Sequence, residues 1–178
     1  NDTSGVNVTW VADIDEDKLN LVKSRYPSTE VSKNPDEVIE SSSVDAIAIA
    51  TPVSTHFDLG LRALRAGKHV LVEKPMAATS EECERLIDEA DKKKLILMVD
   101  HTFPYVGAVR KIKELIDSDQ LGEIFYFDSV RVNLGLFQHD VNVIWDLAVH
   151  DLSILDYLFS EKPMAVSATG MAHISGQP

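Results

Sequence analysis

The sequence is poor in cysteine, in basic residues and in long apolar runs, and each shortage excludes a class of structure. It holds one cysteine, Cys83, among 178 residues, so no disulfide can form within the chain. Its 17 Lys and Arg against 29 Asp and Glu give a formal charge of −12, which disfavours nucleic acid and anionic membranes as partners. The apolar runs, such as residues 46–50, are too short to span a bilayer. We therefore expect a cytoplasmic protein.

Glycine is also scarce at the start of the chain, where Gly5 is the only one among the first 12 residues. The chain begins at Asn1 rather than at methionine, and it stops at Pro178 directly after a strand-like run. These features lead us to expect a fragment, a processed product or an expressed part of a longer protein. The sequence leaves all three open.

Hydrophobic periodicity predicts alternating strands and helices up to residue 99. Strands are expected at residues 6–12, 30–32, 44–50, 69–72 and 95–99. Helices are expected between them, with Asp15, Asn34 and Thr79 as N-caps, and the last of these helices should turn Cys83, Leu86, Ile87 and Ala90 inward. This alternation is typical of a doubly wound parallel α/β sheet, in which strands such as 44–50 and 95–99 are buried on both faces.

The short alternation of strands and helices ends after residue 102. Helices are expected at about 106–117 and 143–159, and longer strands at 123–132 and about 164–172. Long strands with helices segregated from them indicate the first part of an α+β domain. We predict a domain boundary near Thr102.

Asp13 directly follows the first expected strand, and two roles are open to it. An acid at the end of the second strand of a dinucleotide-binding fold bonds the adenosine ribose hydroxyls, and its charge favours NAD over NADP. Alternatively, Asp13 caps the next helix, as Asp15 does. The glycine fingerprint G-x-G-x-x-G belongs roughly 20 residues before such an acid. This sequence has only 12 residues there.

The turn Ala50-Thr51-Pro52 follows the expected strand 44–50. Open α/β sheets bind ligands at this edge, and small hydroxylated residues let a ligand approach the backbone. The alternative is an ordinary strand-to-helix turn with Ser54 or Thr55 as the cap.

Glu73-Lys74-Pro75 ends the strand 69–72. A lysine at this position can direct its ammonium group into the crevice, and Glu73 would orient it. A proline directly after the lysine favours a cis peptide bond. The alternative is a surface Glu–Lys turn.

Asp146 and His150 are four residues apart on an expected helix, so they share one face. A histidine beside a carboxylate can accept a proton from an alcohol near neutral pH. A buried structural pair is the alternative, and no further cluster with ligand spacing predicts a metal site. His101, just past the strand 95–99, should point toward the mouth of the crevice.

Together these motifs resemble one family. Their order is Ala50-Thr51-Pro52, Glu73-Lys74-Pro75 and Asp146-x-x-x-His150, accompanied by the stretches AGKHVLVEKPMA and WDLAVHDLSILDYL. They closely resemble the glucose–fructose oxidoreductase/inositol dehydrogenase/rhizopine-catabolism (Gfo/Idh/MocA) family over essentially the whole chain. The sequence departs from the family at Asp100, where glycine is common, and at Val149, where proline is frequent.

The resemblance implies a Rossmann-like NAD(P)-binding domain over residues 1–102, lacking its first strand and glycine turn. The first part of an α+β domain would follow over residues 103–178, with a sheet that mediates homo-oligomerisation. It implies that Lys74, Asp146 and His150 form the catalytic group. The residues implied to lie along the cofactor are Asp13, Ala50, Thr51, Pro52, His56, Glu73, Lys74 and His101.

The implied activity is that of an NAD(P)-dependent dehydrogenase acting on CH-OH groups. Hydride would pass between NAD(H) and a secondary alcohol of a sugar, nucleotide sugar or cyclitol. Residues 140–155 are most similar to members that oxidise UDP-N-acetyl-hexosamines at C3. Two alternatives stay open. One is a dinucleotide-binding regulator without catalysis, and the other is an inactive fragment that binds NAD poorly because it lacks the phosphate-binding helix N-terminus.

Overall fold

The computed structural model describes residues 3–132 and 141–171. The chain forms two compact units, Asn1–Asp100 and His101–Pro178. Within the described residues, every helix is too short or too polar to cross a lipid bilayer.

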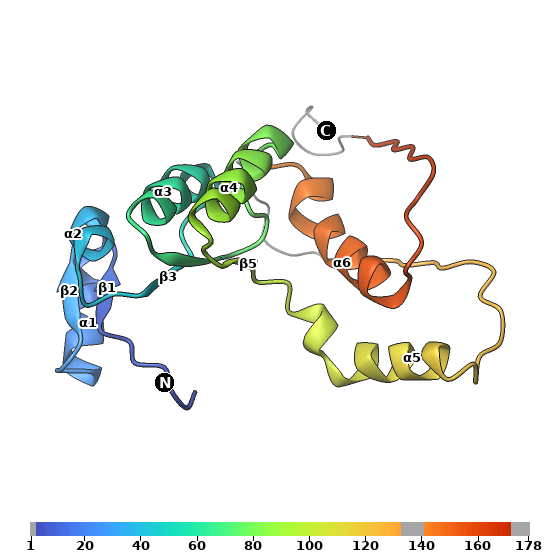
Figure 1. The fold of residues 1–178 in the computed structure, drawn as a ribbon, viewed down its shortest axis with the longest axis horizontal. Coiled ribbons are helices and arrows are strands. Elements are labelled where there is room, and N and C mark those ends of the chain that lie inside the picture. Colours follow the sequence, from blue (N-terminus) through green and yellow to red (C-terminus); the bar gives the residue numbers. More distant parts are fainter. Residues whose placement is uncertain (1–2, 133–140, 172–178) are drawn as a thin grey trace. The chain divides into compact units, whose positions relative to one another are not determined.

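Parallel strands form the frame of the first unit (Figure 1). β1 (Trp10–Ala12) pairs with β2 (Glu30–Ser32). In a second sheet, β4 (His69–Val72) lies between β3 (Ala46–Ile49) and β5 (Leu97–Val99). Every one of these pairs is parallel. The α/β class predicted from the sequence is therefore confirmed.

Four helices follow the strands in the predicted order. They are α1 (Glu16–Arg25), α2 (Pro35–Glu40), α3 (Val53–Arg65) and α4 (Ser80–Lys93). Three begin at the predicted caps: Asp15 accepts from the Asp17 N–H at 2.9 Å, Asn34 from Asp36 at 3.0 Å and Thr79 from Glu82 at 3.2 Å. Each cap satisfies one of the backbone donors that the first turn leaves without a helical partner.

Helices α3 and α4 cover the same face of the sheet β3–β4–β5 (Figure 1). Val70, Val72 and Leu86 are at most 2% exposed in the core that results. The opposite face is open along the row Ala48–Leu71–Met98, where Leu71 is 39% and Met98 41% exposed. The prediction that the segments 44–50 and 95–99 are buried on both faces is thus wrong for the described residues, because both neighbouring helices pack on one side.

Two smaller predictions about the first unit are also corrected. Only Trp10–Ala12 of the expected strand 6–12 pairs, because β2 offers three partners and no more. Ile87, expected to point inward, is 45% exposed, whereas Leu86 beside it is 1% exposed.

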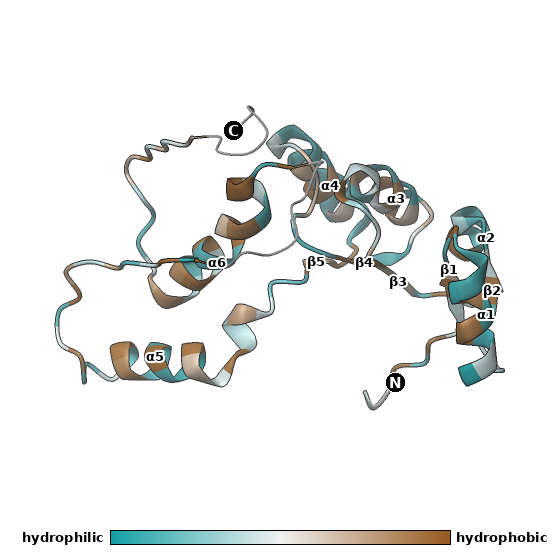
Figure 2. Cartoon of the chain, turned by 180° about the vertical axis from the view of Figure 1, so that it is seen from behind, coloured by the Kyte–Doolittle hydropathy of each residue, from teal (hydrophilic) through white to brown (hydrophobic). Residues whose placement is uncertain are grey.

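The second unit contains the two predicted helices. A short 3₁₀ turn, η1 (Phe103–Tyr105), precedes α5 (Gly107–Asp117), and a π-helical turn, η2 (Ile144–Ala148), continues directly into α6 (Val149–Leu158). Hydrophobic and hydrophilic bands alternate along α5 (Figure 2), as its amphipathic sequence pattern requires.

The long strands expected at 123–132 and 164–172 are not formed in the described residues, and Ala172 lies outside them. A strand needs a partner for its backbone donors and acceptors, and the described residues pair none in these segments. Phe125 and Tyr126 are correspondingly 85% and 81% exposed.

Candidate functional site

The turns after β3 and β4 lie at one edge of the sheet, because the two strands are parallel neighbours. Ala50, Thr51 and Pro52 follow β3, while Glu73 and Lys74 follow β4. The Glu73 N–H donates to the Ile49 carbonyl oxygen at 2.9 Å, which joins the ends of the two strands. The fold thereby brings together two groups of residues that are more than 20 positions apart in the sequence.

The turn after β3 is held by hydroxyl groups. Thr55 Oγ1 donates to the Pro52 carbonyl at 2.8 Å and lies 2.6 Å from Thr51 Oγ1. Pro52 itself is the N-cap of α3, and no side chain caps the first amides of this helix. The predicted alternative of a Ser54 or Thr55 cap is therefore wrong. The Thr55 N–H donates to the Pro52 carbonyl oxygen at 2.9 Å, and no side-chain cap competes with a ligand acceptor for the N–H groups before it.

Lys74 lies half-buried at the end of β4. The peptide bond between Lys74 and Pro75 is cis, as the sequence predicted. The Glu73 carboxylate accepts a hydrogen bond from the Lys74 backbone N–H at 3.3 Å. The Glu73 side chain therefore stabilises the backbone of this turn.

His56 lies in the first turn of α3, and its side chain faces the protein interior. It is 1% exposed. Its Nδ1 is 2.9 Å from the Pro75 carbonyl oxygen, and its Nε2 is 2.7 Å from the Thr51 carbonyl oxygen. The ring thus bridges the turns that follow β3 and β4.

Asp13 directly follows β1, and its carboxylate is partly exposed. One oxygen accepts from the Asp15 N–H at 2.9 Å, and the other lies 3.5 Å from Lys18 Nζ. The Asp15 N–H, together with Lys18, holds the pKa of Asp13 below its ordinary value against the effect of burial. Asp15 is the N-cap of α1, so the helix does not need Asp13 as its cap. Because its pKa is lowered, the Asp13 carboxylate is ionised and can accept hydrogen bonds from a ligand. Sequence reasoning missed Lys18, which lies five positions after Asp13 on α1.

A groove of about 570 Å³ separates the edges of β1 and β3. Its lining includes both strands together with Asp13, Ala50 and Thr51. In a doubly wound sheet with strand order 3-2-1-4-5-6, the strand that leads into the glycine-rich turn lies between the two strands that match β1 and β3. Asp13, Ala50 and Thr51, three of the residues predicted to lie along the cofactor, thus border one groove.

In the second unit, Asp146 and His150 span the junction of η2 and α6. Both are half-buried. Asn142 holds the start of this segment, since its side-chain oxygen accepts from the Trp145 N–H at 3.0 Å and its carbonyl accepts from the Asp146 N–H at 2.9 Å. π-Helical turns within helices are frequent at functional sites. The sequence predicted the helix here but not its π-helical start.

Aromatic and charged side chains surround His150. The Phe103 ring meets the His150 ring edge-on at a centroid distance of 4.9 Å, and the Arg131 guanidinium lies 4.9 Å from the Phe103 ring. Arg131 Nε and Ser129 Oγ donate to the Asp151 carboxylate at 2.5 and 2.6 Å. Sequence reasoning missed all four neighbours. The adjacency of Asp151 to His150 was the one available signal.

Asp151 is ionised within this cluster. Burial raises the pKa of Asp151, but the hydrogen bonds from Arg131 and Ser129 and the Arg131 charge outweigh burial and hold this pKa below its ordinary value. The residue next to His150 therefore holds an ionised carboxylate at neutral pH, paired with the Arg131 guanidinium.

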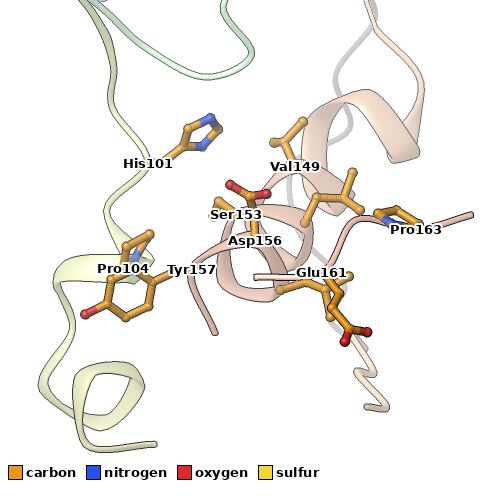
Figure 3. A pocket seen from close by; sticks show the side chains of 10 residues that line it. His101, Pro104, Val149, Ser153, Asp156, Tyr157, Glu161 and Pro163 are labelled. Atoms are coloured by element: carbon orange, nitrogen blue, oxygen red, sulfur yellow. The ribbon is translucent and has the colours of Figure 1, made fainter. Parts of the chain in front are cut away.

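His101 borders a separate pocket of about 740 Å³ in the second unit (Figure 3). His101 and Pro104 lie on one side of this pocket, and α6 supplies Val149, Ser153 and Asp156 on the other. Asp146 and His150 do not line it. The pocket thus contains one of the predicted cofactor residues and neither of the predicted catalytic residues of its own unit.

Comparison with family models matches both units. Residues 1–101 match a model described as "Oxidoreductase family, NAD-binding Rossmann fold", and residues 109–177 match a model described as "GFO/IDH/MocA C-terminal domain".

Individual relatives agree with these matches. The chain is 30% identical over 168 residues to inositol 2-dehydrogenase 2 of Saccharopolyspora erythraea, covering 93% of this chain and 50% of the relative. It is 34% identical over 135 residues to UDP-N-acetylglucosamine 3-dehydrogenase of Acidithiobacillus ferrooxidans, covering 74% and 41%. A crystal structure of a 3-ketoreductase from Actinomadura kijaniata, in complex with NADP and TDP-benzene, matches with a TM-score of 0.58 and 31% identity, covering 63% and 34%. The chain spans about half the length of the curated relatives it matches.

Proposed function

Because the chain belongs to the GFO/IDH/MocA oxidoreductase family, we propose that it is part of an NAD-dependent dehydrogenase. The protein would transfer a hydride between NAD(H) and a secondary alcohol of a sugar, nucleotide sugar or cyclitol. The observation that carries this proposal is the common edge at which the Ala50–Pro52 turn and Glu73-Lys74 follow parallel neighbouring strands. Ligands of open α/β sheets bind outside the carboxyl ends of the strands.

The residues of the first unit fit a dinucleotide. The ionised carboxylate of Asp13 can accept hydrogen bonds from the ribose hydroxyls, and it would repel a 2′-phosphate. Ala50, Thr51 and Pro52 offer exposed small side chains and backbone over which a ligand can lie closely. We therefore propose NAD in preference to NADP, with Glu73 holding the turn of Lys74.

When bound, NAD supplies the hydride acceptor. His150 would accept the hydroxyl proton of the substrate, because a half-buried imidazole next to a fixed carboxylate is a suitable base near neutral pH. The Lys74 ammonium would donate a hydrogen bond to the same oxygen and stabilise its developing negative charge. Asp146, one turn before His150, would orient His150 or Lys74 or bind a neighbouring hydroxyl.

Substitution of the two principal residues tests these roles in the longer protein that contains this chain. Lys74→Ala and His150→Ala should each lower kcat at least about tenfold while NADH binding survives, since removal of one transition-state contact typically costs this much or more. Lys92→Ala, an exposed lysine at the end of α4, is the control and should leave kcat unchanged. Near-normal turnover in both active-site variants would refute the roles.

The names of relatives support the substrate class, because they include dehydrogenases of inositol and of UDP-N-acetylglucosamine. We propose a cyclitol or sugar substrate of this kind, with UDP-N-acetyl-hexosamines as one candidate. A homo-oligomer formed through the second domain is part of the same proposal. A regulator that binds the dinucleotide without turnover is the alternative, and it would bind NADH but form none from NAD and any of these alcohols.

A further inference from the structure

The buried side chain of His56 links two turns that both belong to the proposed NAD site. Thr51 lies in the turn after β3, and Pro75 directly follows Lys74 in the turn after β4. The Glu73–Ile49 backbone hydrogen bond joins the ends of the two strands, and the His56 ring adds a side-chain link between the turns that follow them. Its two nitrogens face one carbonyl oxygen each, at 2.9 and 2.7 Å.

Carbonyl oxygens only accept hydrogen bonds, so each contact requires an N–H on the ring nitrogen that makes it. Both hydrogen bonds form together only in the imidazolium ring, because a neutral ring carries a single N–H. A ring that is 1% exposed leaves no surface for a cofactor to touch. The family resemblance had suggested that His56 lies along the cofactor. The geometry favours an indirect role, in which His56 acts on the backbone of residues that the cofactor and substrate contact.

We propose that His56 is a positioning residue that fixes the Thr51 turn through Nε2 and the Lys74–Pro75 turn through Nδ1. Its importance for Lys74 rests on the proposed function, whereas its effect on the two turns does not. The two contacts use different ring atoms, so they can be removed separately. The amide of asparagine places a donor near the position of Nδ1, and the longer glutamine places one near Nε2.

Hydrogen exchange of the whole protein tests the positioning role without any assay of activity. His56→Phe, which keeps a ring but no donor, should accelerate amide exchange in both turns, residues 50–55 and 73–77. The matched control is His69→Gln. His69 accepts a hydrogen bond from the Ile96 N–H at the other end of β4, and its substitution should leave both turns unchanged. Unchanged exchange in His56→Phe, or equal acceleration throughout the first unit, would overturn the proposal.

Kinetics of the longer protein separate the two contacts. His56→Asn should keep kcat and weaken NAD binding about tenfold, because it loses the contact to Thr51. His56→Gln should keep NAD binding and lower kcat about tenfold, because it loses the contact to Pro75 beside Lys74. Equal changes of both constants in the two variants would contradict separate positioning. If the wild-type protein shows no turnover, the proposed function fails, and the exchange experiment still decides the role of His56.

Discussion

The Asp151 carboxylate joins three neighbours of His150 into one cluster. It accepts hydrogen bonds from Ser129 and Arg131, and Arg131 in turn lies over Phe103, which touches the His150 ring. The spacing Asp146-x-x-x-His150 was visible in the sequence, but these neighbours come from positions 19 to 47 residues away from His150. Contacts across such distances depend on tertiary packing, which periodicity cannot predict.

The lowered pKa of Asp151 predicts how the stability of the second unit depends on pH. A carboxylate whose folded pKa lies below its unfolded value stabilises the fold above about pH 4 and loses this effect as pH falls through the folded pKa. Arg131→Met removes a hydrogen-bond donor and a positive charge. It should lower the free energy of unfolding at neutral pH and reduce the further loss on acidification below about pH 4.

Urea unfolding at a series of pH values measures this change. Arg110→Met serves as the control, because the Arg110 guanidinium also lies near an aromatic ring, 5.4 Å from Tyr105, but belongs to a different contact. The same pH profile for wild type and Arg131→Met would contradict the role of Arg131 as the partner that keeps Asp151 ionised.

Helices and strands of the first unit were predictable to within a few residues because their local signals are strong. Asp15, Asn34 and Thr79 act as caps, and β2 and β4 have the predicted bounds. What the sequence did not predict is which face of each strand is covered. An apolar run identifies a strand suited to burial on both faces, but coverage depends on where the helices pack, and α3 and α4 share one side.

Two adjacent residues of α4 test the packing of this element. Leu86 is 1% exposed and lies in the core cluster of the first unit, whereas Ile87 is 45% exposed. Leu86→Ala should lower the free energy of unfolding by about 2–5 kcal/mol, because it leaves a cavity in a close-packed core. Ile87→Ala should cost about 1 kcal/mol or less, since its side chain is already largely in water. Denaturant unfolding of the chain measures both, and equal losses would contradict the packing of α4.

At the scale of the whole molecule, the residues predicted for the site fall into two groups, one in each unit. Asp13, the Ala50–Pro52 turn, His56 and Lys74 belong to the first, while Asp146 and His150 belong to the second. The sequence predicted the site residues by motif, but it could not show that His56 bridges two turns or that Lys18 accompanies Asp13. The His56 bridge forms only once the strands have paired and α3 has packed, whereas Lys18 meets Asp13 locally, five positions along the chain across the start of α1.

The glycine fingerprint G-x-G-x-x-G, which is absent from the first 12 residues, also concerns the architecture of the whole molecule. The groove between β1 and β3 lies where a doubly wound sheet carries the strand that leads into that fingerprint. The proposed dehydrogenase activity is a proposal for the whole protein, because this chain spans about half the length of the curated relatives it matches.

The most direct test of the central proposal follows a single hydrogen. A cyclitol or UDP-sugar that carries deuterium on the carbon of its reacting hydroxyl is incubated with NAD and the longer protein, and the products are examined by mass spectrometry and NMR. We expect deuterium to appear at C4 of the reduced nicotinamide, and we expect Lys74→Ala and His150→Ala to slow its appearance. Deuterium that stays in the substrate or is released to water, while NADH still binds, would contradict hydride transfer and would favour a dinucleotide-binding regulator.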